Sequence, residues 1–423
     1  MRESEIRKHD RVVIAACFIL TLSMGPLFFT LTTFFSAFEA YFGWSRTLIS
    51  SVQSITLVVA AGSNFAMGWV IDRYGTRRLL IVCSILMGLG LALSSQVHQF
   101  WQLIFLYGIA ALGSGAVYIV PMVTVQRFFS EQKMGLALGL TSAGIAVSRL
   151  IFVPITGFLI STVEWQNTYI ILGIAAWILM VIPSGLLPSK ASTKTVIHSI
   201  PINPVESYIN TDTKGVIHNT NSLEKIPLRN ILKSKTFFFT CLMFILPIMS
   251  NHMIGVHIVP FAEGQGISNT EAATAVGLLG AIGIAGTIIW PALSRRVSWN
   301  WLVSISGVMC GLTILWLVVT SSLWMLYLFV IIFGFFYAAS NPTRMGLIRH
   351  IFGTRELASI MSIIIGIGTL FGALGPLLGG YVYDSTSSYT IALIIGAICW
   401  AVSALLAILL KKSVLSQDND ALA

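Results

Sequence analysis

One arginine interrupts a long apolar stretch of the chain, "GLTSAGIAVSRLIFVPITGF", which runs from Gly139 to Phe158. Arg149 is the only ionisable residue in this stretch. A guanidinium keeps its proton in proteins, and it can hold a carboxylate through two parallel hydrogen bonds. An isolated charge among apolar groups is costly, so it needs a partner. The stretch therefore predicts an anion-binding site at Arg149; the alternative is an arginine satisfied by backbone carbonyls or a neighbouring helix.

Polar side chains in other apolar stretches are candidates to accompany Arg149. Ser142 and Thr156 lie seven residues before and after it, so on a helix the three share a face, which we expect to line a water-filled cavity. The further binding candidates are Tyr118, Asn251, His252, Tyr337 and Asn341. Hydrogen bonding between helices is the alternative role for these polar groups.

Two histidines occur in the stretch "SNHMIGVHIVP" from Ser250 to Pro260. Histidine titrates near physiological pH, so His252 and His257 are candidates for proton coupling, with simple hydrogen bonding as the alternative for each. Their spacing of five residues points them to different helix faces, which does not suit one metal ion. The five cysteines fall in apolar stretches without ligand spacing, so we expect no metal site.

The elements that must position these residues are membrane helices. The chain of 423 residues is 56% hydrophobic and 10% charged, whereas soluble domains are about 25% charged. A helix crosses the ~30 Å hydrocarbon layer with about 20 apolar residues. Twelve continuous stretches qualify, over 12–34, 48–70, 79–97, 101–124, 134–160, 168–187, 237–261, 271–293, 301–320, 323–345, 357–383 and 389–410. Because the runs are continuous rather than alternating, they predict an all-α membrane protein and exclude a barrel.

The basic residues predict the orientation. With both termini in the cytoplasm, 23 of the 25 Lys and Arg residues lie on the cytoplasmic side, among them Arg344. Of the other two, Arg46 lies on the outer side and Arg149 within a span. This bias places the basic residues beside anionic inner-leaflet lipid, which accounts for the net charge of +9. A nucleic-acid partner is not needed to explain that charge. No Asp or Glu falls near the middle of a span.

A polar stretch over 190–235 divides the chain into two six-helix parts, 1–189 and 236–423. It reads as a cytoplasmic linker. No phosphate-binding loop occurs in it or elsewhere in the sequence, so an ATP-driven pump is not expected. The two parts repeat a loop motif, "GWVIDRYGTRRLL" after the second span and "WPALSRRVSWNW" after the eighth. Corresponding motifs in two halves are typical of transporters built from repeats.

The first of these loops resembles the signature of the major facilitator superfamily. The matching residues are Gly68, Asp72, Arg73, Gly75, Arg77 and Arg78. The resemblance implies two pseudo-symmetric six-helix bundles and a cytoplasmic gate. In that gate Gly75 permits a tight turn, and Asp72 pairs with a basic residue such as Arg127 or with a helix N-terminus. The alternative is that these charges only set the topology.

Three further segments resemble the monocarboxylate and oxalate–formate transporter branch: "FGWSRTLISSVQS", "QRFFSEQKMGLALGLTSAG" and "HIVPFAEGQGIS", the last containing His257. The branch carries small organic anions, coupled to protons or by exchange. Thr287 stands where the branch usually has a basic residue in the eighth span, and Phe29 stands near the place of a lysine that some members have in the first. We infer that Arg149 takes over the role of the anion-binding cation.

The sequence thus predicts a secondary active transporter of a small organic anion, a carboxylate, working by alternating access with proton coupling or exchange. We expect a multi-pass monomer in the inner or plasma membrane, with no enzymatic activity and no cofactor. Two alternatives stay open: an exporter of neutral or cationic amphiphilic compounds, and a ligand sensor on a transport fold.

Overall fold

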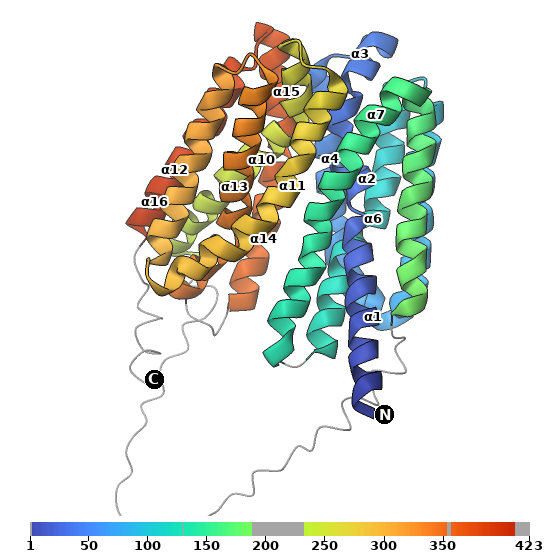
Figure 1. Ribbon diagram of the computed structural model, residues 1–423, viewed down its shortest axis with the longest axis vertical. Helices are drawn as coiled ribbons and strands as arrows, with labels where there is room; N and C mark the ends of the chain where they lie inside the picture. Colours follow the sequence, from blue (N-terminus) through green and yellow to red (C-terminus); the bar gives the residue numbers. More distant parts are fainter. Residues whose placement is uncertain (1, 130, 188–231, 353–356, 411–423) are drawn as a thin grey trace, which may run out of the picture.

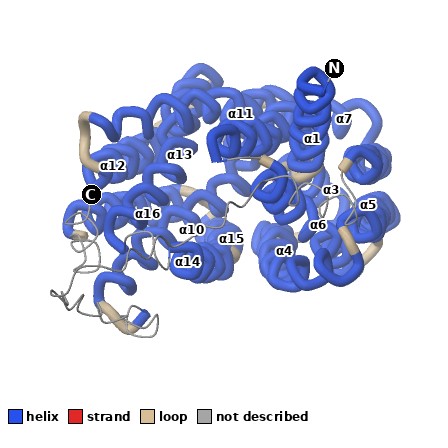
Figure 2. The backbone as a smooth tube through the Cα atoms, turned by 90° about the horizontal axis from the view of Figure 1, so that it is seen from below, coloured by secondary structure: helices blue, strands red, loops and turns tan. Residues whose placement is uncertain are grey.

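The computed structural model describes residues 2–129, 131–187, 232–352 and 357–410, and these residues are helical with short connections (Figures 1 and 2). The longer helices of the first half are α1 (Arg2–Leu22), α4 (Arg46–Tyr74), α5 (Thr76–Leu93), α6 (Phe100–Phe128) and α7 (Glu131–Leu186). Those of the second half are α10 (Lys235–Gly264), α11 (Asn269–Ala292), α12 (Trp299–Val318), α13 (Leu323–Phe352), α14 (Leu357–Gly372), α15 (Leu374–Thr386) and α16 (Thr390–Leu409).

Buried apolar side chains form one large cluster mainly in the first half, two mainly in the second, and a smaller one around Met253. The halves meet along two seams, α7 against α11 and α4 against α15. In the first seam a Cβ on Gly277 would meet Pro154; in the second, a Cβ on Gly380 would meet the backbone of Thr47. The predicted division at a linker stays a prediction, since 188–231 lies outside the described residues.

The first expected span, 12–34, is a continuous helix in our prediction, and the structure corrects this. After α1 the chain forms α2 (Gly25–Phe28), the 3-10 turn η1 (Leu31–Phe34) and α3 (Phe35–Phe42). Pro26 stands at the start of α2, where it disrupts the helix coming from α1. A Cβ on Gly25 would overlap the ring of Phe152 on α7, so only glycine allows this close approach.

The two expected spans 134–160 and 168–187 fall on α7, which ends one residue earlier, at Leu186. The two limbs of α7 reverse direction at Glu164 (φ 68°, ψ 162°) (Figure 1). Among the described residues, ten stretches are long and apolar enough to cross a membrane, and one of them, 139–186, contains this reversal. The membrane character is confirmed, while the number of twelve spans stays a prediction.

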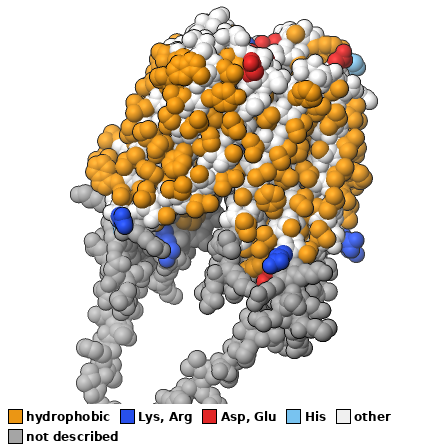
Figure 3. All heavy atoms as spheres, viewed as in Figure 1, with side chains coloured by type: hydrophobic (Ala, Val, Ile, Leu, Met, Phe, Trp, Pro, Cys, Tyr) orange, Lys and Arg blue, Asp and Glu red, His pale blue; other side chains and the backbone are white. Residues whose placement is uncertain are grey.

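Apolar side chains cover the flank of the molecule, and charged ones gather towards its two ends (Figure 3). The start of α1 and the end of α16 lie at one end of the molecule (Figure 1), which we call the proximal end; the opposite one is the distal end. One basic residue departs from its expected place: Arg344 is 1% exposed in the interior of the second half. The expected span there, 323–345, ends too early, because α13 continues as a helix to Phe352.

Candidate functional site

Arg149 lies in the first limb of α7, and its side chain reaches to the second half of the molecule. Its Nη2 is 3.8 Å from the position that a Cβ would take on Gly255 of α10. The Phe29 ring, on the broken first helix, lies 5.5 Å from the guanidinium carbon. The side chain is partly accessible, but its Nε is buried and has no hydrogen-bond acceptor among the described residues. The guanidinium therefore reaches from one half to the other, and its Nε is left without an acceptor in the part of the chain that the structure describes.

Three predicted site residues surround Arg149 from the second half. Tyr337 of α13 and His252 of α10 both lie within electrostatic range of the guanidinium. The Tyr337 side chain also lies within interaction range of Asn251, next to His252 on α10. All three are partly exposed rather than closed into the core. Donors, an imidazole and the Arg149 guanidinium thus lie close together, an arrangement suited to a small anion.

The remaining binding candidates do not join this cluster in the same way. Ser142 is exposed, whereas Thr156 is fully buried and its hydroxyl donates to the Phe152 carbonyl oxygen of its own helix at 2.6 Å. The expectation that Thr156 lines a cavity is therefore wrong: the hydroxyl satisfies itself locally. Asn341 is exposed and accepts a hydrogen bond from Arg344 at 3.0 Å. The side chain of Tyr118 lies outside the described residues.

A second polar cluster, the distal cluster, joins the halves at the distal end. It consists of Glu39, Arg46, His257, Asp384 and Tyr389. Arg46 donates to both Glu39 carboxylate oxygens, at 2.6 Å and 3.3 Å, and to the Tyr389 hydroxyl at 2.9 Å. Asp384 accepts from the backbone N–H groups of Arg46 (3.1 Å) and Thr47 (2.8 Å). A carboxylate at a helix N-terminus is favourable, so Asp384 ties α15 to the start of α4.

His257 belongs to this distal cluster and not to the surroundings of Arg149. Its Nδ1 is 3.1 Å from the Tyr389 hydroxyl, and its Nε2 is 2.9 Å from the carbonyl oxygen of Pro376 on α15. The ring is 4% exposed and packs edge-on against Phe35. The two histidines therefore occupy different environments, His252 near the free guanidinium and His257 in a satisfied network.

The loop that predicted the cytoplasmic gate lies between α4 and α5. Gly75 has a positive φ of 83°, which confirms the expected tight turn. Arg73, Arg77 and Arg78 are exposed. The side chains of Gly68, Asp72 and Arg127 lie outside the described residues, so the pairing of Asp72 stays a prediction.

Sequence reasoning missed the roles of Asp384 and Tyr389, and it did not identify the burial of Arg344. Arg46 carried a signal for the first two, because it was the one basic residue expected in an outer loop and so required a partner there. Arg344 donates to the Ser340 carbonyl oxygen at 3.2 Å and to the Ser340 hydroxyl at 2.9 Å. Its guanidinium carbon lies 4.8 Å from the centre of the Phe244 ring. Ser340 lies on the same helix as Arg344, whereas Phe244 lies on α10. Helical periodicity alone did not identify the contact with Phe244.

Comparisons with known proteins agree with this architecture. Monocarboxylate transporter 12 of Xenopus laevis is 23% identical over 399 residues, covering 91% of this chain and 85% of the relative. The uncharacterized MFS-type transporter YcxA of Bacillus subtilis (strain 168) is 27% identical over 403 residues, covering 92% and 91%. These relatives confirm the resemblance predicted from the three shorter segments.

Among solved structures, a bacterial homolog of the human lysosomal transporter Spinster, in an inward-facing and unoccupied conformation, shares the fold. The TM-score is 0.73 at 16% identity, with 95% of this chain and 97% of that chain covered. Residues 16–321 and 300–421 match the Major Facilitator Superfamily. The chain therefore belongs to the Major Facilitator Superfamily, whose members are membrane transporters and not enzymes.

Proposed function

We propose that this chain is a secondary active transporter of a small organic anion, a carboxylate, and that Arg149 binds the negative charge of the substrate. The observation that carries the proposal is the guanidinium itself, which reaches from α7 to α10 while its Nε has no acceptor among the described residues. A charge left without a partner inside an apolar protein is costly, and a bound carboxylate supplies the partner.

Tyr337, Asn251 and His252 complete the proposed binding site. Their hydroxyl, amide and imidazole groups offer hydrogen bonds beside the charge, and they come from the half opposite Arg149. A substrate held between Arg149 and these groups contacts both halves at once. A site at the interface of two halves suits alternating access, since rocking of one half against the other exposes it to each side in turn.

The proposed carrier is a monomer with both termini in the cytoplasm of an inner or plasma membrane, so its distal end faces outward. Transport is coupled to protons or proceeds by exchange against a second anion, with His252 as the coupling candidate nearest to the site. Asp72 closes the cytoplasmic side with Arg127 or a helix N-terminus. One of the named relatives, monocarboxylate transporter 12, supports the substrate class by its name.

A thermal-shift screen of the purified protein tests the substrate class. Mono- and dicarboxylates are compared with neutral and cationic amphiphilic compounds, each at several concentrations. Binding to the native state raises the unfolding temperature by mass action. We expect stabilisation by at least one carboxylate. Stabilisation by cationic compounds alone would replace this proposal with an amphiphile exporter.

A further inference from the structure

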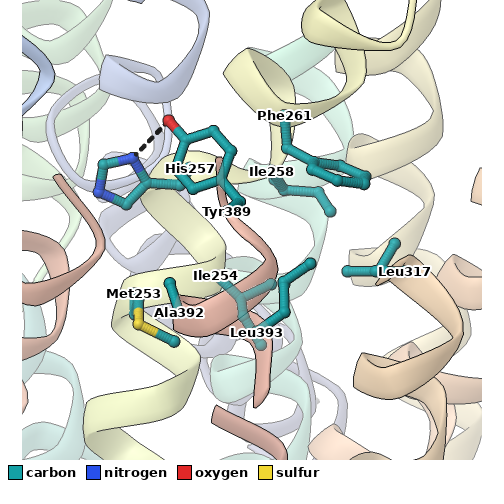
Figure 4. A pocket seen from close by; sticks show the side chains of 9 residues that line it. All are labelled: Met253, Ile254, His257, Ile258, Phe261, Leu317, Tyr389, Ala392 and Leu393. Atoms are coloured by element: carbon teal, nitrogen blue, oxygen red, sulfur yellow. Dashed lines mark hydrogen bonds between the residues drawn. The ribbon is translucent and has the colours of Figure 1, made fainter. Parts of the chain in front are cut away.

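The hydrogen bonds of His257 identify which of its ring nitrogens carries the proton. Nε2 lies 2.9 Å from the Pro376 carbonyl oxygen, which can only accept, so Nε2 carries a hydrogen. In the neutral ring Nδ1 is then an acceptor, and the Tyr389 hydroxyl, 3.1 Å away, donates to it (Figure 4). The distal cluster thus assigns a single tautomer to a buried imidazole.

The Tyr389 hydroxyl extends this chain of hydrogen bonds to the other half of the molecule. While its hydrogen points to His257, its oxygen accepts from Nη1 of Arg46 at 2.9 Å. His257 and Tyr389 belong to the second half, whereas Arg46 begins α4 of the first. The tautomer of one ring is therefore linked to a contact that holds the halves together at the distal end.

We propose that His257 is a proton-binding site that controls the distal opening of the transporter. A proton on Nδ1 turns the acceptor into a donor, so the Tyr389 hydrogen must turn away from the ring, and the Tyr389 oxygen then faces two cationic donors, the imidazolium and Arg46. The imidazolium also places a second positive charge near Arg46. The inference rests on the proposed function in one respect, that the distal end opens during transport.

The other charged groups around His257 act on the same contact. Asp384 of α15 and Arg46 both lie within electrostatic range of the ring. Glu39 of α3 is paired with Arg46, and Glu263, on the same helix as His257, hydrogen-bonds with Asn269 at 2.8 Å. Asp384 attracts an imidazolium, but its oxygens already hold the start of α4. Its attraction to a protonated ring therefore competes with the second contact between the halves.

The experiment measures the distal distance by electron–electron resonance between spin labels at Ala40→Cys on α3 and Ser385→Cys on α15. Both positions are exposed, and the five native cysteines are buried, so labelling is selective. The purified protein is studied without substrate from about pH 8 to about pH 4, a range that extends well below the ordinary histidine pKa of about 6.5. We expect the long-distance population to grow as the pH falls.

Two variants act in opposite directions on the proposed mechanism. His257→Gln keeps a donor and an acceptor but cannot titrate, so it should stay closed at every pH. Tyr389→Phe removes the hydroxyl between the ring and Arg46, so it should show the open population already at pH 8, where folding is not challenged by acid. His98→Gln is the matched control, because His98 is an exposed histidine at the same end and should leave the pH response intact.

An unchanged pH response in His257→Gln, or a Tyr389→Phe protein that stays closed at pH 8, would overturn the proposal. A wild-type protein without any pH response would do the same. None of these measurements involves an anion. Failure of the gate therefore differs from failure of the anion site, which appears only in binding experiments on Arg149.

Discussion

Two arginines that contact both halves of the molecule differ in their partners. Arg46 uses Nε and Nη2 for the Glu39 carboxylate and Nη1 for the Tyr389 hydroxyl, and it lies 3.8 Å above the Tyr383 ring. Arg149 has an aromatic neighbour, Phe29 at 5.5 Å, but its Nε has no acceptor among the described residues. A guanidinium with all its groups engaged stabilises one arrangement of the protein, whereas one without a counter-charge is available to a ligand.

The comparison predicts that arginine-to-glutamine substitutions at the two sites affect the stability of the ligand-free protein differently. Arg46→Gln leaves Glu39 without its cation and should lower the free energy of unfolding by about 1–2 kcal/mol, less than for a deeply buried pair because Glu39 is 31% exposed. Arg149→Gln removes an uncompensated charge and should be neutral or stabilising. Thermal unfolding of both purified variants measures the difference; an equal loss of stability in both would remove the distinction between the arginines.

The next prediction concerns the polar neighbours of Arg149. Tyr337→Phe removes the hydroxyl that lies within electrostatic range of Arg149, and anion affinity should fall about fivefold, or about 1 kcal/mol. Tyr327→Phe is the matched control on the same helix, because Tyr327 packs at the edge of the apolar cluster of the second half. Calorimetry with the anion found in the screen measures both. If the two variants lose affinity equally, Tyr337 is not part of the site.

The smallest expected effect belongs to Asp384. Asp384→Asn keeps an oxygen that can accept a hydrogen bond but loses the negative charge at the start of α4. The interaction of such a charge with a helix N-terminus is worth about 0.5–1 kcal/mol. The distal end should open two- to fivefold more often, as measured with the labels on Ala40 and Ser385. Anion affinity in the closed state should not change. A distal distance that is insensitive to this substitution would show that Asp384 does not hold the halves together.

Much of the fold could be predicted from the sequence because membrane helices are long, apolar and continuous. The turn at Gly75 could also be predicted, because the backbone conformation of a glycine in a short loop depends on neighbouring residues and not on distant contacts. The break after Leu22 was missed because it depends on the contact of Gly25 with Phe152, which joins residues far apart in the sequence.

The candidate site was predictable in part. An arginine alone in an apolar stretch identified Arg149, and polar residues at Asn251, His252 and Tyr337 were found by the same criterion. The burial of Arg344 and the partners of His257 depend on packing against α10, α15 and α16, which no periodicity reveals. His257 therefore appeared to be equivalent to His252, although their surroundings differ.

Binding calorimetry on Arg149 variants tests the central claim most directly. Wild-type protein, Arg149→Lys and Arg149→Gln are compared as folded, monodisperse samples with the carboxylate that stabilises the wild type. Lysine keeps the charge but not the planar fork, so binding should be weak; glutamine should lose on the order of 2–3 kcal/mol, roughly a hundredfold in affinity. A well-folded Arg149→Gln that binds the anion with wild-type affinity would contradict the assignment of Arg149 as the anion site.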